Sequence, residues 1–562
     1  MLMCVADLRA KYVSTAEKRK AIEDTVRKVF KYGPLVLIDV TTGRLCDRQV
    51  LPDLFKFDAT FKELVSSMTQ EVDKERVWEI VSKYFGYVMF SHVWGDGKEE
   101  EKKNEPSFKT VKSSISVYRL PDMPMNQKLR NFCAKVTELG YRWAWSDTCC
   151  IDKSEDAILN RSLRSMYKWY EASDATLVFL GDVSSDLGDL LHSLWMTRAW
   201  TLQEALVPRR ILFYDRDWKL YRGIVSDNHK KPGVILQELA NATGVLPQTL
   251  ISFHPDSLGV REKLRLASTR TATQDEDAAY SLIGIFKSDI TPRYGEGEDA
   301  LGHLLEGIVA HLGEVTVLAW TGSPSSYNSC LPSTLVVYSQ EPYTPPALSA
   351  ADMDLRTTQL STSLPRGDAM DIYYRVIHLP RARFTNRRLQ LPCIVFRVKS
   401  LDVESEDLDN HENRYRIKVS GLGEVDFTTA DSLPLAEPRR LVAVHPWISE
   451  IQGPHSHDAV SGDVSDSEIE EEPEAEVGRD VRMHDRLGSA PTLDGSPSNQ
   501  LDKHTLALQM IARLQQPFSA LLLLRQPGGE YKRVAAEHEI VVRISRNYIR
   551  PKDIHTVVLD IL

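Results

Sequence analysis

Apolar positions change their spacing several times along this 562-residue chain, and the spacing predicts the elements. Four short, continuous apolar runs are typical of strands that are buried on both faces. They lie at residues 88–90, 141–145, 175–180 and 211–214. Between the runs, apolar residues recur every three or four positions, as Leu159, Leu163, Met166 and Tyr170 do. This alternation predicts an α/β fold in which helices cover both faces of a parallel sheet.

The pattern differs on either side of this region. Helical spacing is expected over 5–30 and 60–83, with a strand at 36–40 between them, and again over 233–242, 258–288 and 298–312. From about residue 314 the positions alternate with many prolines, which predicts antiparallel strands. These strands are expected at 335–338, 373–378, 393–399, 415–419 and 440–444. Residues 504–515 favour a helix, and 519–524, 539–543 and 556–562 favour strands.

We therefore expect five regions. They are an N-terminal helical and strand extension (1–84), an α/β domain with a helical extension (85–300), a β-rich region (301–452), an acidic disordered linker (453–502) and a C-terminal helix and strand segment that packs on the β-rich region (503–562). The linker is rich in serine, glycine, proline and acids, so it cannot bury a core.

Charge and cysteine usage exclude several classes of protein. The net charge of −10 is concentrated in 458–480, where ten acids stand against one arginine, so the rest is close to neutral and no nucleic-acid partner is expected. The apolar runs are too short to span a bilayer, and the first twenty residues do not form a signal peptide. The seven cysteines include no C-x-x-C pair, so we expect no metal site and a reducing, cytoplasmic location.

Polar residues gather where the predicted strands end. Ser91, Trp94 and Gly95 follow the first apolar run, Asp147 and Asp152 follow the second, and Trp200 and Glu204 lie on a short helix after the third. In an open α/β sheet, the loops at the carboxyl ends of the strands meet in a crevice that binds ligands. These residues are therefore the candidate site, with Glu204 as the candidate catalytic acid.

Several spaced motifs resemble one known family. The motifs are FSHVWG at 90–95, WSDTCCID at 145–152, RAWTLQE at 198–204, DEDAAYSLIG at 275–284 and YGEG at 294–297. In this order they resemble the fungal heterokaryon incompatibility (HET) domain over roughly 85–300. The chain departs from the family pattern at His92, where tyrosine is frequent, and at Lys153, where glutamine is frequent.

The resemblance implies a fold and a chemistry. The HET domain is related to Toll/interleukin-receptor (TIR) domains, so it implies a TIR-like, flavodoxin-like parallel sheet flanked by helices, followed here by the mainly β C-terminal region. Some TIR domains cleave NAD at the nicotinamide–ribose bond with a glutamate, and Glu204 stands in the corresponding segment. The resemblance implies NAD as a substrate rather than a bound cofactor, bound by Ser91, Trp94, Gly95, Asp147, Asp152 and Trp200. It also implies fungal self/non-self recognition and regulated cell-death signalling, with self-association through this domain and a protein partner at the β-rich region.

Alternatives remain open at this point. The protein can instead be a non-enzymatic scaffold that oligomerises for signalling. Glu204 can simply pair with Arg198 or Arg209 on a solvated helix face. Trp143, Trp145 and Trp200 can be core residues rather than platforms for a planar ring.

Overall fold

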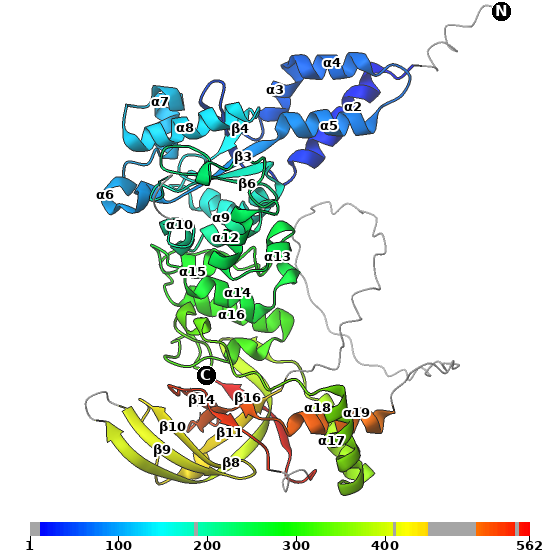
Figure 1. Ribbon diagram of the computed structural model, residues 1–562, viewed down its shortest axis with the longest axis vertical. Helices are drawn as coiled ribbons and strands as arrows, with labels where there is room; N and C mark the ends of the chain where they lie inside the picture. Colours follow the sequence, from blue (N-terminus) through cyan, green and yellow to red (C-terminus); the bar gives the residue numbers. More distant parts are fainter. Residues whose placement is uncertain (1–11, 185–188, 408–411, 448–501, 546–549) are drawn as a thin grey trace, which may run out of the picture.

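The computed structural model describes residues 12–184, 189–407, 412–447, 502–545 and 550–562. The chain runs from a helical extension, through an α/β unit and a helical segment, to a β-rich end, and Figure 1 shows the last three stacked along the long axis. The expected acidic linker lies outside the described residues, apart from Asp502. In the part of the chain described, no helix has both the length and the apolar character needed to span a membrane.

The α/β unit is built on a six-stranded sheet. In spatial order its strands are β2 (Arg44–Asp47), β1 (Val36–Asp39), β4 (Trp143–Trp145), β3 (Tyr87–His92), β5 (Ala175–Phe179) and β6 (Ile211–Tyr214). The last four are parallel, whereas β1 pairs antiparallel with β4 and β2. The parallel strands follow the chain order second, first, third, fourth, which is the flavodoxin-like order. The expected parallel sheet flanked by helices is confirmed.

Alternation along β3 explains how both faces of the sheet are covered. Phe90 faces α8 (Pro124–Glu138), where it stacks on Phe132 with ring centroids 4.3 Å apart. The next residue, Ser91, points to the opposite face. That face carries α9 (Asp156–Ala172), α10 (Leu194–Thr197) and α11 (Thr201–Leu206). Every residue of β3 to β6 is buried, as continuous apolar runs require.

The N-terminal extension contains α2 (Thr15–Phe30), α3 (Leu51–Phe57), α4 (Ala59–Ser67) and α5 (Lys74–Phe85). The helix expected over 60–83 is therefore two helices. They are separate because Asp58 and Asp73 each accept a backbone N–H at the start of α4 and α5. The hairpin of β1 and β2 joins this extension to β4, where Arg142 pairs with Asp39 at 2.8 Å.

The helical segment contains α12 (Val234–Thr243), α13 (Pro247–Ile251), α14 (Val260–Ser268), α15 (Asp277–Tyr280) and α16 (Asp299–Leu312). The long helix expected over 258–288 is wrong, because it stops at Ser268. There the backbone pairs with the segment before α11: Thr271 N–H donates to Thr197 O at 2.6 Å, and Ala199 N–H donates to Thr271 O at 2.9 Å. This pairing brings Arg270 to the start of α11.

The β-rich end contains a sheet with the spatial order β10-β9-β8-β11-β13-β14-β16. The strands are β8 (Arg388–Asp407), β9 (Glu412–Val419), β10 (Gly423–Thr429), β11 (Leu441–Pro446), β13 (Leu521–Arg525), β14 (Tyr531–Val534) and β16 (His555–Ile561), and β7 (Arg383–Thr385) pairs with β8. Because β16 also pairs with β8, five of these strands form a closed ring. The small pair β12 (Phe518–Ser519) and β15 (Val541–Val542) lies outside it.

Two of the strands expected in this region are helical. Residues 335–338 belong to a 3₁₀ turn, Leu335–Ser339, and 373–378 lie in and just after α18 (Arg366–Ile377). The buried residues of α18 are Ala369, Ile372, Tyr373 and Val376. This spacing is helical and differs from the alternation of apolar and polar residues that a strand would show. α18 packs with α17 (Ala350–Ser363) and α19 (Lys503–Leu514) beside the sheet (Figure 1).

Candidate functional site

Glu204 lies at the centre of a buried hydrogen-bonded chain. Its residue is 7% exposed, and its Oε2 accepts the Oγ–H of Ser91. Ser91 Oγ in turn accepts the indole N–H of Trp195, on α10, at 2.7 Å. Ser91 is the penultimate residue of β3 and is paired with Val178 of β5. The cluster therefore sits beneath the carboxyl ends of β3 and β5, where the strand order reverses.

Polar side chains fix both ends of the six-residue α11. At its start, Arg270 Nη1 donates to Arg198 O at 2.9 Å and to Thr201 Oγ1 at 2.8 Å. Beyond its end, Lys230 Nζ donates to Leu206 O and Pro208 O, both at 2.8 Å. Burial lowers the pKa of Arg270 to about 10 and that of Lys230 to about 7. These contacts anchor the segments before and after α11, and Lys230 also satisfies the Leu206 carbonyl, one of those that a helix end leaves open, so together they hold Glu204 in place.

The environment of Glu204 favours its protonated form. Burial raises the pKa of this carboxyl to about 8, against the hydrogen bond from Ser91, which lowers it. The negative charge of Asp147 raises it further, whereas Tyr170 of α9 and Arg270 lower it. Burial also raises the pKa of Tyr170 well above its usual value. Glu204 therefore carries a proton at neutral pH in this closed arrangement.

A second polar group adjoins the first at the end of β4. Trp94 Nε1 donates to Asp147 Oδ2 at 2.9 Å, and Lys153 Nζ lies 3.6 Å above the centre of the Trp94 ring. His92 is buried with its Nε2 3.7 Å from Asp147 Oδ1 and its Nδ1 3.7 Å from Glu105 Oε1. Burial alone would raise the pKa of Asp147, but His92, Lys153 and Trp94 outweigh it and lower that pKa. Asp147 is thus an anion while Glu204 is neutral.

Behind this group, Lys128 ties the loop after β3 to α8. Its Nζ donates to Glu105, to Asp96 Oδ1 at 3.0 Å and to Val93 O at 3.3 Å. Gly95 N–H also donates to Glu105 Oε1, at 3.0 Å. Gly95 has a φ of +59°, and an added Cβ would lie 2.5 Å from Lys102 N, so only glycine suits this position. Its N–H is already engaged within the protein.

The structure brings some of the expected site residues together and separates others. Ser91 donates to Glu204, Asp147 influences the pKa of Glu204, and Trp94 donates to Asp147. Gly95 is bonded to Glu105 instead. Asp152 faces its own turn, where its Oδ1 accepts from Ser154 N at 3.1 Å and Ser154 Oγ at 2.6 Å. Trp200 interacts with a different carboxyl, that of Asp277, and its hydrogen bond lowers the pKa of that group.

The surface interpretation of Glu204 is wrong, because α11 is buried throughout and Arg198 donates instead to Thr273. Trp143 and Trp145 are fully buried core residues. Sequence reasoning missed Trp195, Tyr170 and Arg270. Tyr170 is part of the apolar stripe of α9, and only the backbone pairing at Thr271 places Arg270 here. Among the described residues, no group of three or more His, Cys, Asp or Glu side chains is placed to hold a metal ion.

Comparisons with known proteins agree on one family. Residues 87–193, from the start of β3 to the residue before α10, match the family model for heterokaryon incompatibility protein (HET). The chain is 33% identical over 234 residues to the vegetative incompatibility protein HET-E-1 of Podospora anserina. That alignment covers 40% of this chain and 16% of the relative's length. No solved structure matches. Residues 87–193 are therefore similar to the HET family, and the chain spans about a sixth of the length of the incompatibility protein that it matches.

Proposed function

We propose that the α/β unit is a TIR-like domain that cleaves NAD at the nicotinamide–ribose bond, with Glu204 as its catalytic carboxylate. The observation that carries this proposal is the buried Glu204 carboxyl, bonded to Ser91 where the strand order of the sheet reverses. Buried carboxyls with displaced pKa values beside a strand end are candidates for catalysis. The resulting product would signal in self/non-self recognition and regulated cell death.

The reaction requires few catalytic groups from the protein. The bond between the ribose carbon and the nicotinamide nitrogen breaks, and its electron pair leaves with nicotinamide as a neutral ring. Positive charge develops on the ribose, water adds to the same carbon, and one proton is released. A carboxylate placed against the ribose stabilises that charge, and Glu204 would provide this carboxylate.

The site must open for this reaction. In the closed arrangement the Ser91 hydroxyl is hydrogen-bonded to the carboxyl of Glu204, and burial keeps that carboxyl neutral. A ribose hydroxyl can take the place of the Ser91 hydroxyl, and it donates in the same way. Deprotonation of Glu204 then provides the carboxylate. We assign this opening to self-association of the chain.

Trp94 provides the surface for a planar ring. It is 37% exposed, and Lys153 already lies over its face as a cation would. A positively charged nicotinamide ring can replace the ammonium there, while Asp147 holds the indole by its N–H. Asp147 would then lie near the charge of the substrate before cleavage.

The test is NAD loss and nicotinamide release by the purified chain at concentrations where it self-associates. Glu204→Gln is the catalytic variant, and Asp152→Asn is the matched control, because the Asp152 carboxylate accepts hydrogen bonds from Ser154 within its own turn. Release that disappears in Glu204→Gln and persists in Asp152→Asn supports the proposal. Equal release by Glu204→Gln rejects it.

The closed arrangement around Glu204 also favours a second function. Glu204 is nearly shut off from solvent and hydrogen-bonded within the protein, an arrangement that also suits a domain used only for assembly. In this alternative the α/β unit oligomerises as a signalling scaffold, and the β-rich end binds a protein partner. Absence of nicotinamide release from protein shown to be oligomeric would favour it.

A further inference from the structure

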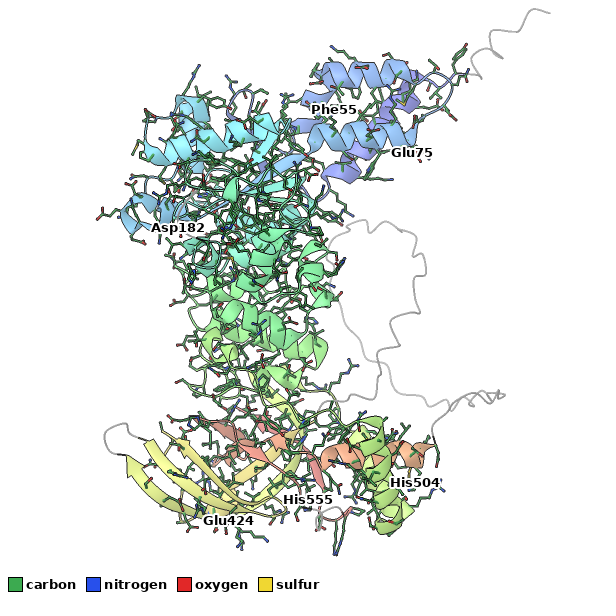
Figure 2. All side chains as sticks on the ribbon, viewed as in Figure 1. Phe55, Glu75, Asp182, Glu424, His504 and His555 are labelled. Atoms are coloured by element: carbon green, nitrogen blue, oxygen red, sulfur yellow. The ribbon has the colours of Figure 1, made fainter. Side chains whose placement is uncertain are left out.

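A cavity of about 410 Å³ lies in the N-terminal extension, between α2 and α3. Figure 2 labels Phe55 in this extension, apart from Asp182, which follows β5 in the α/β unit. The floor of the cavity is apolar. It consists of Ile22, Val26 and Phe30 from α2, Phe55 from α3 and Phe61 from α4. A volume and floor of this kind are typical of sites for small apolar ligands.

The floor is held rigidly by neighbouring aromatic rings. Phe55 lies 4.4 Å from Tyr84 and 5.3 Å from Phe85, measured between ring centroids, and Phe30 lies 5.1 Å from Phe85. Tyr84 O accepts the indole N–H of Trp143 at 2.9 Å, which fixes the end of α5 to β4. The cavity is therefore preformed rather than a gap between loose helices.

The rim of the cavity is basic. Arg27, Lys31, Arg48 and Lys56 surround it, against the single acid Glu23. Lys56 pairs with Glu23 at 3.3 Å and Arg27 pairs with Asp24 at 3.2 Å. The remaining two cations give the rim an excess of positive charge.

Arg48 is the cation best placed to bind an anion. Its Nη1 donates to two carbonyl oxygens, Gly33 O at 3.0 Å and Lys31 O at 3.5 Å, which orient the half-buried guanidinium. Within the described residues, Arg48 makes no ion pair with a carboxylate. Burial and the nearby charge of Arg161 lower its pKa. An oriented, partly desolvated guanidinium without an acid is a strong site for a carboxylate.

We propose that this cavity binds a small amphiphilic monocarboxylate, with a medium-length apolar chain on the floor and its carboxylate on Arg48. Such a ligand matches both the apolar floor and the unpaired charge at the rim. This site is separate from Glu204 and does not depend on NAD cleavage.

The test is isothermal titration of the full chain with octanoate and with 1-octanol, which share a chain and differ in charge. We expect saturable binding of octanoate at one site, at least about tenfold tighter than octanol. Arg48→Met should bring the two affinities together. Arg44→Met, an exposed arginine on β2 outside the cavity, should leave the preference unchanged.

A second variant tests the apolar floor. Val26→Trp fills the cavity and should weaken both ligands at least about tenfold, provided that its circular dichroism and melting transition stay cooperative. Should that variant misfold, the Arg48→Met comparison decides alone. Equal affinities of the wild-type chain for octanoate and octanol, unchanged octanoate binding by folded Val26→Trp, or no saturable octanoate binding would each overturn the proposal.

Discussion

The hydroxyl of Ser91, on the central strand β3, donates to the carboxyl of Glu204, on α11, 113 residues further along the chain. This bond joins the two segments that the sequence marks as one site. It also sets the protonation of Glu204, because a hydrogen bond to the carboxylate lowers its pKa, whereas burial and Asp147 raise it. Several experiments can measure these opposing effects.

Ser91→Ala should raise the pKa of Glu204 further above 8, because it removes a donor that stabilises the carboxylate. It also leaves the buried Trp195 N–H without its acceptor, at a cost of about 1–3 kcal/mol in the free energy of unfolding. The protonated carboxyl band in difference infrared spectra, assigned by its loss in Glu204→Gln, reports the titration. An unchanged or lower pKa would contradict the bond.

Asp147→Asn should shift the pKa of Glu204 in the opposite direction. The amide keeps an oxygen for the Trp94 indole but removes the negative charge that raises the pKa of Glu204. The same infrared band measures the effect. Asp152→Asn, which changes a carboxylate in a separate turn, should leave the Glu204 titration where it is. A downward shift of equal size in both variants would mean that the effect is not local.

Glu204→Gln should alter how stability depends on pH. The pKa of Glu204 is about 8 in the folded chain and its ordinary value is 4.5, so between these values the folded chain holds a proton that the unfolded chain has lost. This carboxyl therefore imposes no penalty below about pH 4.5, a growing one up to pH 8 and a constant one above it. Urea unfolding of both proteins should show the variant gaining stability relative to the wild type as pH rises, by a few kcal/mol at most. A constant difference across this range would contradict a buried, protonated Glu204.

Lys128→Met should destabilise the α/β unit by about 3–5 kcal/mol, because it leaves the buried carboxylate of Glu105 without its cation. Adding Glu105→Gln should recover part of that loss, since a neutral amide is cheaper to bury. Chemical unfolding of the wild type, both single variants and the double variant measures the coupling between the two side chains. Strictly additive effects would show that the ion pair does not stabilise the loop after β3.

Much of the α/β unit follows from local pattern. Continuous apolar runs identify β3, β5 and β6, and the polar residues at strand ends include Ser91 and Asp147, which act on Glu204, and Trp94, which donates to Asp147. Side chains that serve their own turn cannot be separated from site residues by pattern alone. Asp152, which binds Ser154, shows this.

Contacts made by distant backbone segments escape sequence reasoning for another reason. The pairing of Thr271 with Thr197 ends α14 and delivers Arg270 to α11, but neither segment has a strand pattern. The strand expected at 373–378 falls on the end of α18, whose buried apolar residues include the neighbouring positions Ile372 and Tyr373, which weaken the helical signal. The cavity between α2 and α3 depends on packing that no single segment specifies.

The role that we propose for Glu204 is that of a carboxylate in NAD cleavage. Its most direct test is nicotinamide release by the oligomeric chain, measured from pH 6 to 9 with Glu204→Gln beside it. Because Glu204 must first lose the proton that burial holds on it up to about pH 8, release should increase as pH rises towards 8 and should be lost in the variant. Release that is insensitive to the variant, or no release from protein shown to be oligomeric, would contradict it.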